Sequence, residues 1–275
     1  MTTMLILNIM GVPLEVMHIP PAPTWAPGPA LVFLHEGLGS VSLWRDWPAQ
    51  LCQQLQLPGL VYSRQGYGGS APVVDVRGEP RVLNGVRQGR LQPDYMHHEA
   101  LTVLPALLQT LGIHAPILVG HSDGGTIALI HASQHPVTAG IVMAPHVMVE
   151  DISVKAITQA REAFSQGALR DRLAKFHADV DGAFWQWNEV WLSAGFRSFD
   201  IRQEIESITA PLLAIQGEDD AYGTLAQIDE IARHVPHTQL LKLAKCGHSP
   251  HKDQPEQVNA AIAEFIKPLV SGLAG

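Results

Sequence analysis

The stretch LVGHSDGGTIALI, residues 118–130, constrains the fold more than any other part of the chain. An apolar run typical of a buried strand breaks into a serine flanked by glycines and then continues as an apolar helix. Residues 120–124 match G-x-S-x-G, a strand-to-helix turn so sharp that its serine takes strained backbone angles. Glycine two residues to either side leaves room for the crossing backbone. The pattern predicts that the Ser122 hydroxyl stands exposed above a sheet.

Apolar β-rich runs alternate with helical patterns along the chain, which is typical of an α/β fold whose mostly parallel sheet is covered on both faces. Eight strands are expected, at residues 4–9, 13–18, 30–35, 59–64, 116–120, 140–144, 211–216 and 239–244. The first two, joined at Met10 and Gly11, are expected to form a hairpin. Helices are expected at residues 44–55, 95–111, 122–133, 225–234 and 255–270.

Two segments do not fit this alternation. Residues 71–94 contain three prolines, three glycines and four arginines, so we interpret them as a long loop. This loop is either a solvated basic segment, a hood over the site or an anchor for an acidic substrate. Residues 147–207 are helical and rich in aromatics, which predicts a cap inserted after the sixth strand. The core would then comprise residues 1–146 and 208–275.

The chain holds 26 acidic and 18 basic residues, a formal net charge of -8. This balance disfavours a nucleic-acid or anionic-membrane partner, so we expect a small-molecule partner. No stretch approaches the roughly 18 uninterrupted apolar residues of a membrane span. The N-terminal residues lack the basic segment and cleavage pattern of a signal peptide. We therefore expect a soluble, cytoplasmic protein, and the sequence leaves open whether it is a monomer or a homodimer.

Cysteine and histidine spacing gives no sign of a metal or redox site. Cys52 and Cys246 lie far apart without CxxC spacing, as is typical of free thiols in a reducing compartment. No HExxH motif occurs, and neither the histidines at 97 and 98 nor those at 248 and 251 match a known ligand pattern. We predict no metal and no cofactor.

A serine nucleophile needs an imidazole to take its proton and an acid to orient that imidazole. An apolar strand is followed by a turn with Asp219 and Asp220, and the loop after a later strand presents His248. The chain order is therefore serine, aspartate, histidine. That order is found in α/β-hydrolases and differs from the chymotrypsin and subtilisin orders.

These motifs resemble the capped α/β-hydrolases, which include esterases, enol-lactonases, carbon-carbon bond hydrolases and proline iminopeptidases. The resemblance spans nearly the whole chain and rests on LVFLHEGLGS, YSRQGYGGS, LVGHSDGG, QGEDD and CGHSPHKDQPE. It implies a catalytic triad of Ser122, Asp220 and His248. It selects Asp220 because the family's acid follows the strand's glycine by three residues. Asp219 is the main alternative, and Glu150 and Asp151 are weaker ones because some members place the acid there.

The resemblance also implies an oxyanion hole of two backbone N–H groups, from Asp123 and from Gly37 in HEGLGS. Relatives usually have His-Gly-x-x-Gly here, so Glu36 replaces a glycine. A carboxylate aimed at the developing anion would oppose it, so we expect Glu36 to point away and pin the loop, with Arg64 as its candidate partner. A direct catalytic or substrate-binding role for Glu36 is the alternative.

Four further side chains are candidates for the substrate pocket: His121, Trp185, Trp187 and Trp191. His121 lies inside the G-x-S-x-G turn, and packing or local hydrogen bonding is the simpler account of it. Trp187 and Trp191 share a helical face, and both an ordinary cap core and an apolar acyl or aryl pocket fit that pattern.

The sequence therefore predicts a serine hydrolase acting on a small or medium carboxylic ester or lactone. The first alternative is hydrolysis of a carbon-carbon bond in a β-diketone, which uses the same triad. The second is a ligand receptor that retains a vestigial triad. The fold does not decide between these functions.

Overall fold

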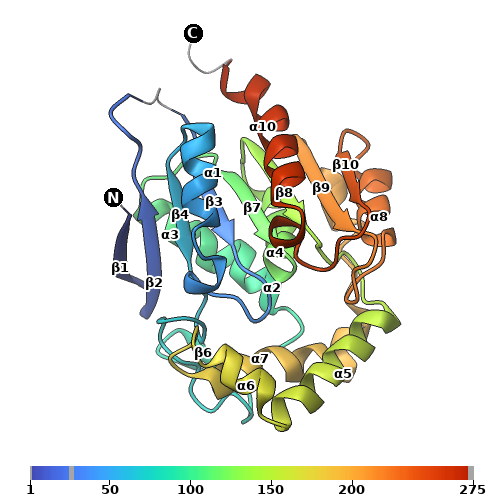
Figure 1. Ribbon diagram of the computed structural model, residues 1–275. Coiled ribbons are helices and arrows are strands. Elements are labelled where there is room, and N and C mark those ends of the chain that lie inside the picture. Colours follow the sequence, from blue (N-terminus) through green and yellow to red (C-terminus); the bar gives the residue numbers. More distant parts are fainter. Residues whose placement is uncertain (1, 25–27, 272–275) are drawn as a thin grey trace.

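Eight strands form one sheet in the order β1-β2-β4-β3-β7-β8-β9-β10 in the computed structural model, which describes residues 2–24 and 28–271 (Figure 1). The bounds of the strands are Thr3–Ile9 (β1), Val12–Ile19 (β2), Leu31–Leu34 (β3), Gly59–Tyr62 (β4), Ile117–His121 (β7), Ala139–Met143 (β8), Leu212–Gly217 (β9) and Gln239–Leu243 (β10). β1 and β2 form the expected hairpin, and β2 pairs antiparallel with β4. All other neighbours in this sheet are parallel, which confirms the predicted fold class.

Strands β3, β4, β7, β8 and β9 are buried on both faces because helices cover each side, whereas the edge strand β10 is mostly exposed. Along β3, Leu31 and Phe33 belong to one apolar cluster, whereas Val32 and Leu34 belong to the other. The first cluster includes residues of α1 (Trp47–Leu55) and α10 (Pro255–Ser271). The second includes residues of α3 (Leu104–Thr110), α4 (Asp123–Gln134) and α8 (Ala226–His234). Because these strands are mostly apolar along their length, the polar side chains of the site lie in the segments that follow the strands.

A helical segment separates β8 from β9. It contains α5 (Asp151–Ser165), α6 (Ala168–Leu173) and α7 (Val180–Trp191), followed by short 3-10 turns at Ala194–Ser198 and Glu204–Ser207. Figure 1 shows α5, α6 and α7 gathered together at the bottom of the view, below the sheet and the helices that flank it. The position matches the predicted insertion, while the division into core and cap stays a prediction. The outer limits of the predicted core, residues 1 and 272–275, lie outside the described residues.

Three local predictions need correction. Residues 71–94 contain a small hairpin of β5 (Arg81–Leu83) and β6 (Val86–Gln88). Its turn, Asn84 and Gly85, has positive φ at both positions, as an Asn-Gly hairpin turn requires. The helix expected at 95–111 is divided into α2 (Tyr95–His98), a π-helix (Glu99–Val103) and α3. α1 begins at Trp47, after a 3-10 turn at Ser42–Trp44.

Candidate active site

The turn between β7 and α4 has the strained geometry that its sequence predicts. Ser122 has φ 52° and ψ -119°, a backbone conformation that L-residues rarely adopt. A Cβ at Gly120 would lie 2.3 Å from the carbonyl oxygen of Gly124, and one at Gly124 would lie 2.0 Å from that of Leu34. Both glycines are therefore required for the backbone to pass, and the strain fixes the direction of the serine side chain.

Ser122 is less accessible than we expected, since only 7% of its surface is exposed. Helix α7 explains the difference. The Trp187 ring lies so close to Gly37 that a Cβ there would be 2.1 Å from Trp187 Nε1, and Trp191 donates a hydrogen bond to Asp123, the next residue after Ser122. The helical segment therefore covers the turn in this structure.

His248 lies between Ser122 and Asp220. Its Nε2 is 3.0 Å from Ser122 Oγ, and its Nδ1 is 2.8 Å and 2.9 Å from the two carboxylate oxygens of Asp220. One imidazole thus contacts a hydroxyl on one side and a carboxylate on the other. This arrangement can transfer a proton from the hydroxyl to the ring while the carboxylate stabilises the resulting positive charge.

The environment of Asp220 keeps it ionised. The residue is 6% exposed, and its carboxylate also accepts hydrogen bonds from Gln216 Nε2 at 2.6 Å and from the N–H of Tyr222 at 2.8 Å. Burial favours the neutral acid, but the hydrogen bond and charge of His248 and the Tyr222 N–H outweigh it. They hold the pKa of Asp220 below its ordinary value.

The three alternative acids lie elsewhere. Asp219 is exposed, and its N–H donates to the carbonyl of Cys246. Glu150 accepts hydrogen bonds from the N–H and hydroxyl of Thr224 and from the side-chain amide of Gln227. Asp151 has a 95% exposed side chain that pairs with Arg197. None of the three has a described contact with His248.

The two backbone N–H groups predicted as oxyanion donors have no acceptor in the described structure. Within the described parts of the chain, neither the N–H of Gly37 nor that of Asp123 donates a hydrogen bond. Asp123 is the first residue of α4, where N–H groups have no acceptor within the helix and the helix dipole favours negative charge. These N–H groups are the two that the sequence suggested as oxyanion donors.

The side chain of Asp123 joins the turn to three other elements. Its carboxylate accepts hydrogen bonds from the Tyr95 hydroxyl at 2.6 Å and from Trp191 Nε1 at 3.3 Å, and it lies 3.6 Å from Arg64 Nη2. Tyr95 is on α2, Trp191 on α7, and Arg64 follows β4. Asp123 is 0% exposed, and burial raises the pKa of its carboxyl against the opposing effect of Arg64.

The Glu36 carboxylate has partners other than the expected one, and its predicted pairing with Arg64 is wrong. Arg64 instead donates to the backbone carbonyls of His35 at 2.8 Å and Glu36 at 3.1 Å. The Glu36 carboxylate lies 3.7 Å from His121 Nδ1 and 3.8 Å from Lys252 Nζ. Burial opposes its ionisation, yet His121 and Lys252 hold the pKa of Glu36 below its ordinary value. The hydrogen bonds from Arg64 to the two carbonyls anchor the loop that contains Glu36.

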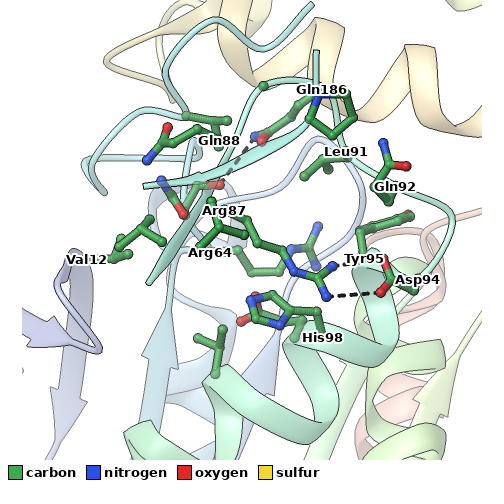
Figure 2. A pocket seen from close by; sticks show the side chains of 18 of the residues that line it. Val12, Arg64, Arg87, Gln88, Leu91, Gln92, Asp94, Tyr95, His98 and Gln186 are labelled. Carbon is green, nitrogen blue, oxygen red and sulfur yellow. Dashed lines mark hydrogen bonds and ion pairs between the residues drawn. The ribbon is translucent and has the colours of Figure 1, made fainter. Parts of the chain in front are cut away.

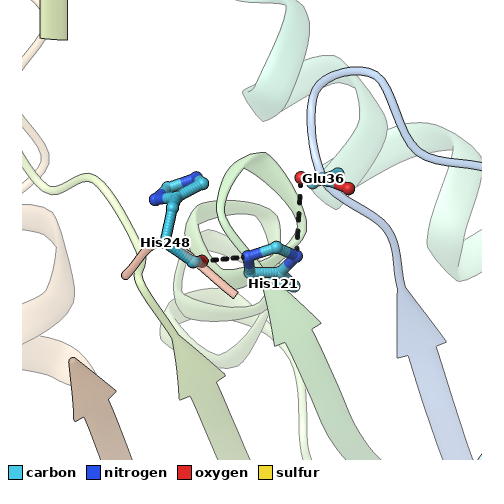
Figure 3. Close-up of side chains that lie close together, drawn as sticks. All are labelled: Glu36, His121 and His248. Carbon is cyan, nitrogen blue, oxygen red and sulfur yellow. Dashed lines mark hydrogen bonds and ion pairs between the residues drawn. The ribbon is translucent and has the colours of Figure 1, made fainter. Parts of the chain in front are cut away.

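Glu36, His121 and His248 form a cluster with metal-ligand chemistry (Figure 3), because one donor atom from each lies within 4.8 Å of the others. The hydrogen bonds limit this use. His121 Nε2 is 2.6 Å from the His248 carbonyl oxygen, and both ring nitrogens of His248 contact Ser122 or Asp220. Burial also lowers the pKa of His121 to about 4, so the ring is neutral near pH 7. A cation bound by all three would take His248 away from Ser122.

One predicted pocket residue has no described contact with the triad, whereas two residues that were not predicted lie beside His248. Trp185 has described ring contacts with Phe164, Phe184 and Arg77, and none with Ser122 or His248. His146 and Tyr222, which the sequence analysis missed, have ring centroids 6.0 Å and 4.7 Å from that of His248. Their place in sequence offers a signal, since His146 follows a strand by three residues and Tyr222 follows Asp220 by two.

A model of the alpha/beta hydrolase family matches residues 31–261, most of the chain. The chain belongs to this family. The resemblance inferred from the motifs is thus confirmed. Within the described residues, no helix is both long and apolar enough to cross a membrane.

Relatives of this family member differ in their named activities. The sn-1-specific diacylglycerol lipase ABHD11 of Mus musculus is 24% identical, over 86% of this chain and 81% of that protein. The 2-succinyl-6-hydroxy-2,4-cyclohexadiene-1-carboxylate synthase of Enterobacter sp. is 26% identical, over 87% and 92%. The structure of the enol-lactonase from Burkholderia xenovorans LB400 superposes with a TM-score of 0.72 at 19% identity, over 96% and 100%. The shared fold does not identify a substrate.

Proposed function

We propose that this hydrolase-family protein is a serine hydrolase that cleaves a small or medium carboxylic ester or lactone through an acyl-enzyme intermediate. The observation that carries the proposal is the position of His248, with Nε2 3.0 Å from Ser122 Oγ and Nδ1 2.8 Å from Asp220. Hydrogen bonding on both sides of one imidazole is what activation of a serine requires.

In the first half of the reaction, Ser122 Oγ attacks the substrate carbonyl while His248 Nε2 takes its proton. The carbonyl oxygen becomes an anion, and the N–H groups of Asp123 and Gly37 are the donors proposed to bind it. The protonated ring then gives its proton to the leaving alcohol, and an acyl group stays on Ser122. In the second half, His248 takes a proton from water as that water attacks the acyl group. The ring then returns the proton to Ser122 Oγ as the bond between Oγ and the acyl carbon breaks and the acid leaves.

Residues 147–207 are proposed to be a cap over a core formed by the rest of the chain. Trp187 lies against Gly37 and Ser122 is 7% exposed, so a substrate carbonyl needs α7 to shift before it reaches the two N–H groups. Trp187 and Trp191 would then form part of an apolar wall beside the acyl group.

Ester chemistry is supported by two of the relatives. The mouse protein is named as a lipase and the Burkholderia protein as a lactonase, and both activities break an acyl-oxygen bond. The proposed partner is a small molecule, since the net charge of -8 disfavours nucleic acid. We place the reaction in the cytoplasm, because Cys52 and Cys246 are both free and buried, as is ordinary in a reducing compartment.

The test is hydrolysis of p-nitrophenyl esters, lactones and β-diketones by the wild type and by Ser122→Ala. We expect ester or lactone turnover that falls by at least about a thousandfold in the variant. Equal rates in both proteins would refute the assignment of Ser122 as the nucleophile. Turnover of β-diketones alone would show that the enzyme cleaves a carbon-carbon bond and not an ester. A single acylation without further turnover would favour a ligand receptor with a vestigial triad.

A matched pair of substitutions tests the acid. Asp220→Asn removes the charge beside His248, whereas Asp219→Asn makes the same change at the exposed neighbour. We expect Asp220→Asn to lower kcat by about a thousandfold or more, and Asp219→Asn by less than about threefold. The reverse order would reassign the acid to Asp219.

A further inference from the structure

A cavity of about 620 Å³ lies beneath the β5-β6 hairpin, and neither Ser122, Asp220 nor His248 is among its lining residues. Figure 2 shows it between the hairpin, the outer hairpin of the main sheet and helix α2. Gln186 reaches it from α7, and Tyr95 lines it from α2. Its volume is within the range of small-molecule sites, about 300–1,000 Å³.

The walls of the cavity are mostly apolar. Its apolar lining side chains come from four separate parts of the chain: Ile9, Val12, Leu14, Val73, Val86, Leu91 and Val103. One wall includes Glu99 and Val103, the ends of the π-helix. Such π-turns are rare in α-helices and are found often at functional sites. Pro105, which has no N–H to donate to residue 101, accounts for the local change of hydrogen bonding.

The arginines of the hairpin segment do not make this cavity a site for an anion. Arg87 binds Asp94 through two hydrogen bonds of 2.8 Å and 3.0 Å, as Figure 2 shows. The other lining arginines also have carboxylate partners: Arg64 with Asp123, Arg81 with Asp75 and Arg90 with Glu79. The positive charges in the wall are therefore compensated, and the earlier alternative of an anchor for an acidic substrate loses its basis.

Uncharged polar groups remain for a ligand. Gln88 and Gln92 line the cavity, the first half-buried and the second exposed. His98 also lines it, and burial together with Arg87 lowers the pKa of this imidazole, so the ring is neutral near pH 7. A hydroxyl or carbonyl group of a ligand can form hydrogen bonds with the two side-chain amides and with this ring.

The cavity is connected to the nucleophile turn. Tyr95 and Arg64 both line it, and both contact the Asp123 carboxylate, at 2.6 Å and 3.6 Å. Asp123 directly follows Ser122. A molecule that presses against Tyr95 therefore bears on the residue whose N–H is the proposed oxyanion donor.

We propose that this cavity is a second ligand site, separate from the Ser122 site, which takes an uncharged and largely apolar molecule bearing a hydroxyl or carbonyl group. Its occupant acts on turnover through Tyr95, Arg64 and Asp123. The binding itself does not depend on the proposed hydrolysis, whereas the effect on turnover rests on it.

Two dyes with the same ring frame test the binding. N-phenylnaphthylamine is uncharged, and anilinonaphthalenesulfonate adds one sulfonate. We expect the neutral dye to bind at one site, at least about tenfold more tightly than the sulfonate. Val86→Trp, which fills the cavity, should weaken the neutral dye by at least about tenfold. Val74→Trp, at a 56% exposed valine outside the lining, is the matched control and should leave it unchanged.

Equal affinity for the two dyes, or binding that Val86→Trp leaves intact, would overturn the site. Separation from the Ser122 site is tested with Ser122 blocked by an organophosphate, or with Ser122→Ala if no adduct forms. The neutral dye should stay bound in either protein. Displacement by the organophosphate adduct would show that the dye occupies the substrate site and would refute a second one.

The effect on turnover is measured with a p-nitrophenyl ester at saturating dye. We expect kcat to change by at least about twofold in the wild type and in Val74→Trp, and to stay constant in Val86→Trp. A competitive effect, on KM alone, would contradict the separate site. A protein that binds the dye but hydrolyses no ester would refute the proposed function while leaving the ligand site established.

Discussion

The buried carboxylate of Asp123 gives a prediction whose size follows from its contacts. Asp123→Leu replaces the carboxylate by a branched apolar group and removes the acceptor that Asp123 offers to Tyr95, Trp191 and Arg64. A buried donor without a partner costs about 1–3 kcal/mol. The Tyr95 bond of 2.6 Å falls in the upper half of this range, and the contacts of 3.3 Å and 3.6 Å fall near its lower end.

Three effects reduce the sum. Arg64 keeps its hydrogen bonds to the carbonyls of His35 and Glu36, and Trp191 Nε1 keeps the Tyr95 hydroxyl as an acceptor at 3.0 Å. Burial of the Asp123 carboxylate itself is also unfavourable, as its raised pKa indicates. We therefore expect Asp123→Leu to lower the free energy of unfolding by about 3 kcal/mol. Asp123→Asn keeps an acceptor for Tyr95, so it should lower the free energy of unfolding by only about 1–2 kcal/mol.

Urea unfolding followed by circular dichroism measures both changes. The control is Asp181→Leu on α7, which removes an exposed ion pair with Arg170 on α6 and should cost less than about 1 kcal/mol. Losses of about 1 kcal/mol or less in Asp123→Leu would show that the three contacts do not stabilise the turn. That result would also weaken the proposed connection between the cavity and the nucleophile.

The remaining predictions concern the loop, the cap and a buried histidine. Glu36→Gln should lower kcat by less than about tenfold, and a loss above about 100-fold at unchanged stability would give Glu36 a direct catalytic role. Gly37→Ala, whose Cβ would lie 2.1 Å from Trp187 Nε1, should destabilise the fold by about 1–3 kcal/mol, and by less in a Trp187→Ala background. Burial lowers the pKa of His131 from 6.5 to about 4, so below pH 6.5 the unfolded chain binds a proton that the native chain does not. Acidification to about pH 5 should therefore cost the wild type about 2 kcal/mol more than His131→Asn, and parallel pH profiles would contradict this.

Local sequence patterns predicted most of the sheet and the turn at Ser122. The glycines at 120 and 124 fix the backbone by contacts within the turn and with β3, so a short motif carries the information. Chain order pointed to His248 and to the pair Asp219 and Asp220, because these residues follow strands whose ends meet at one edge of the sheet, and the family resemblance then selected Asp220.

Features that depend on distant side chains were not predicted. The burial of Ser122 depends on α7, and the partners of Glu36 depend on how Lys252 and His121 pack against its loop. The β5-β6 hairpin is different, since Asn84 and Gly85 gave a local signal that the density of prolines and glycines around them obscured. Its cavity forms only where the hairpin meets α2 and the outer strands.

The most direct test of the central claim is the mass of the protein after reaction with a p-nitrophenyl organophosphate, with the modified peptide identified. The account predicts one adduct per chain on Ser122, none in Ser122→Ala, and formation at least about 100-fold slower in His248→Gln. An adduct on another residue, or the same rate without His248, would contradict activation of Ser122 by His248.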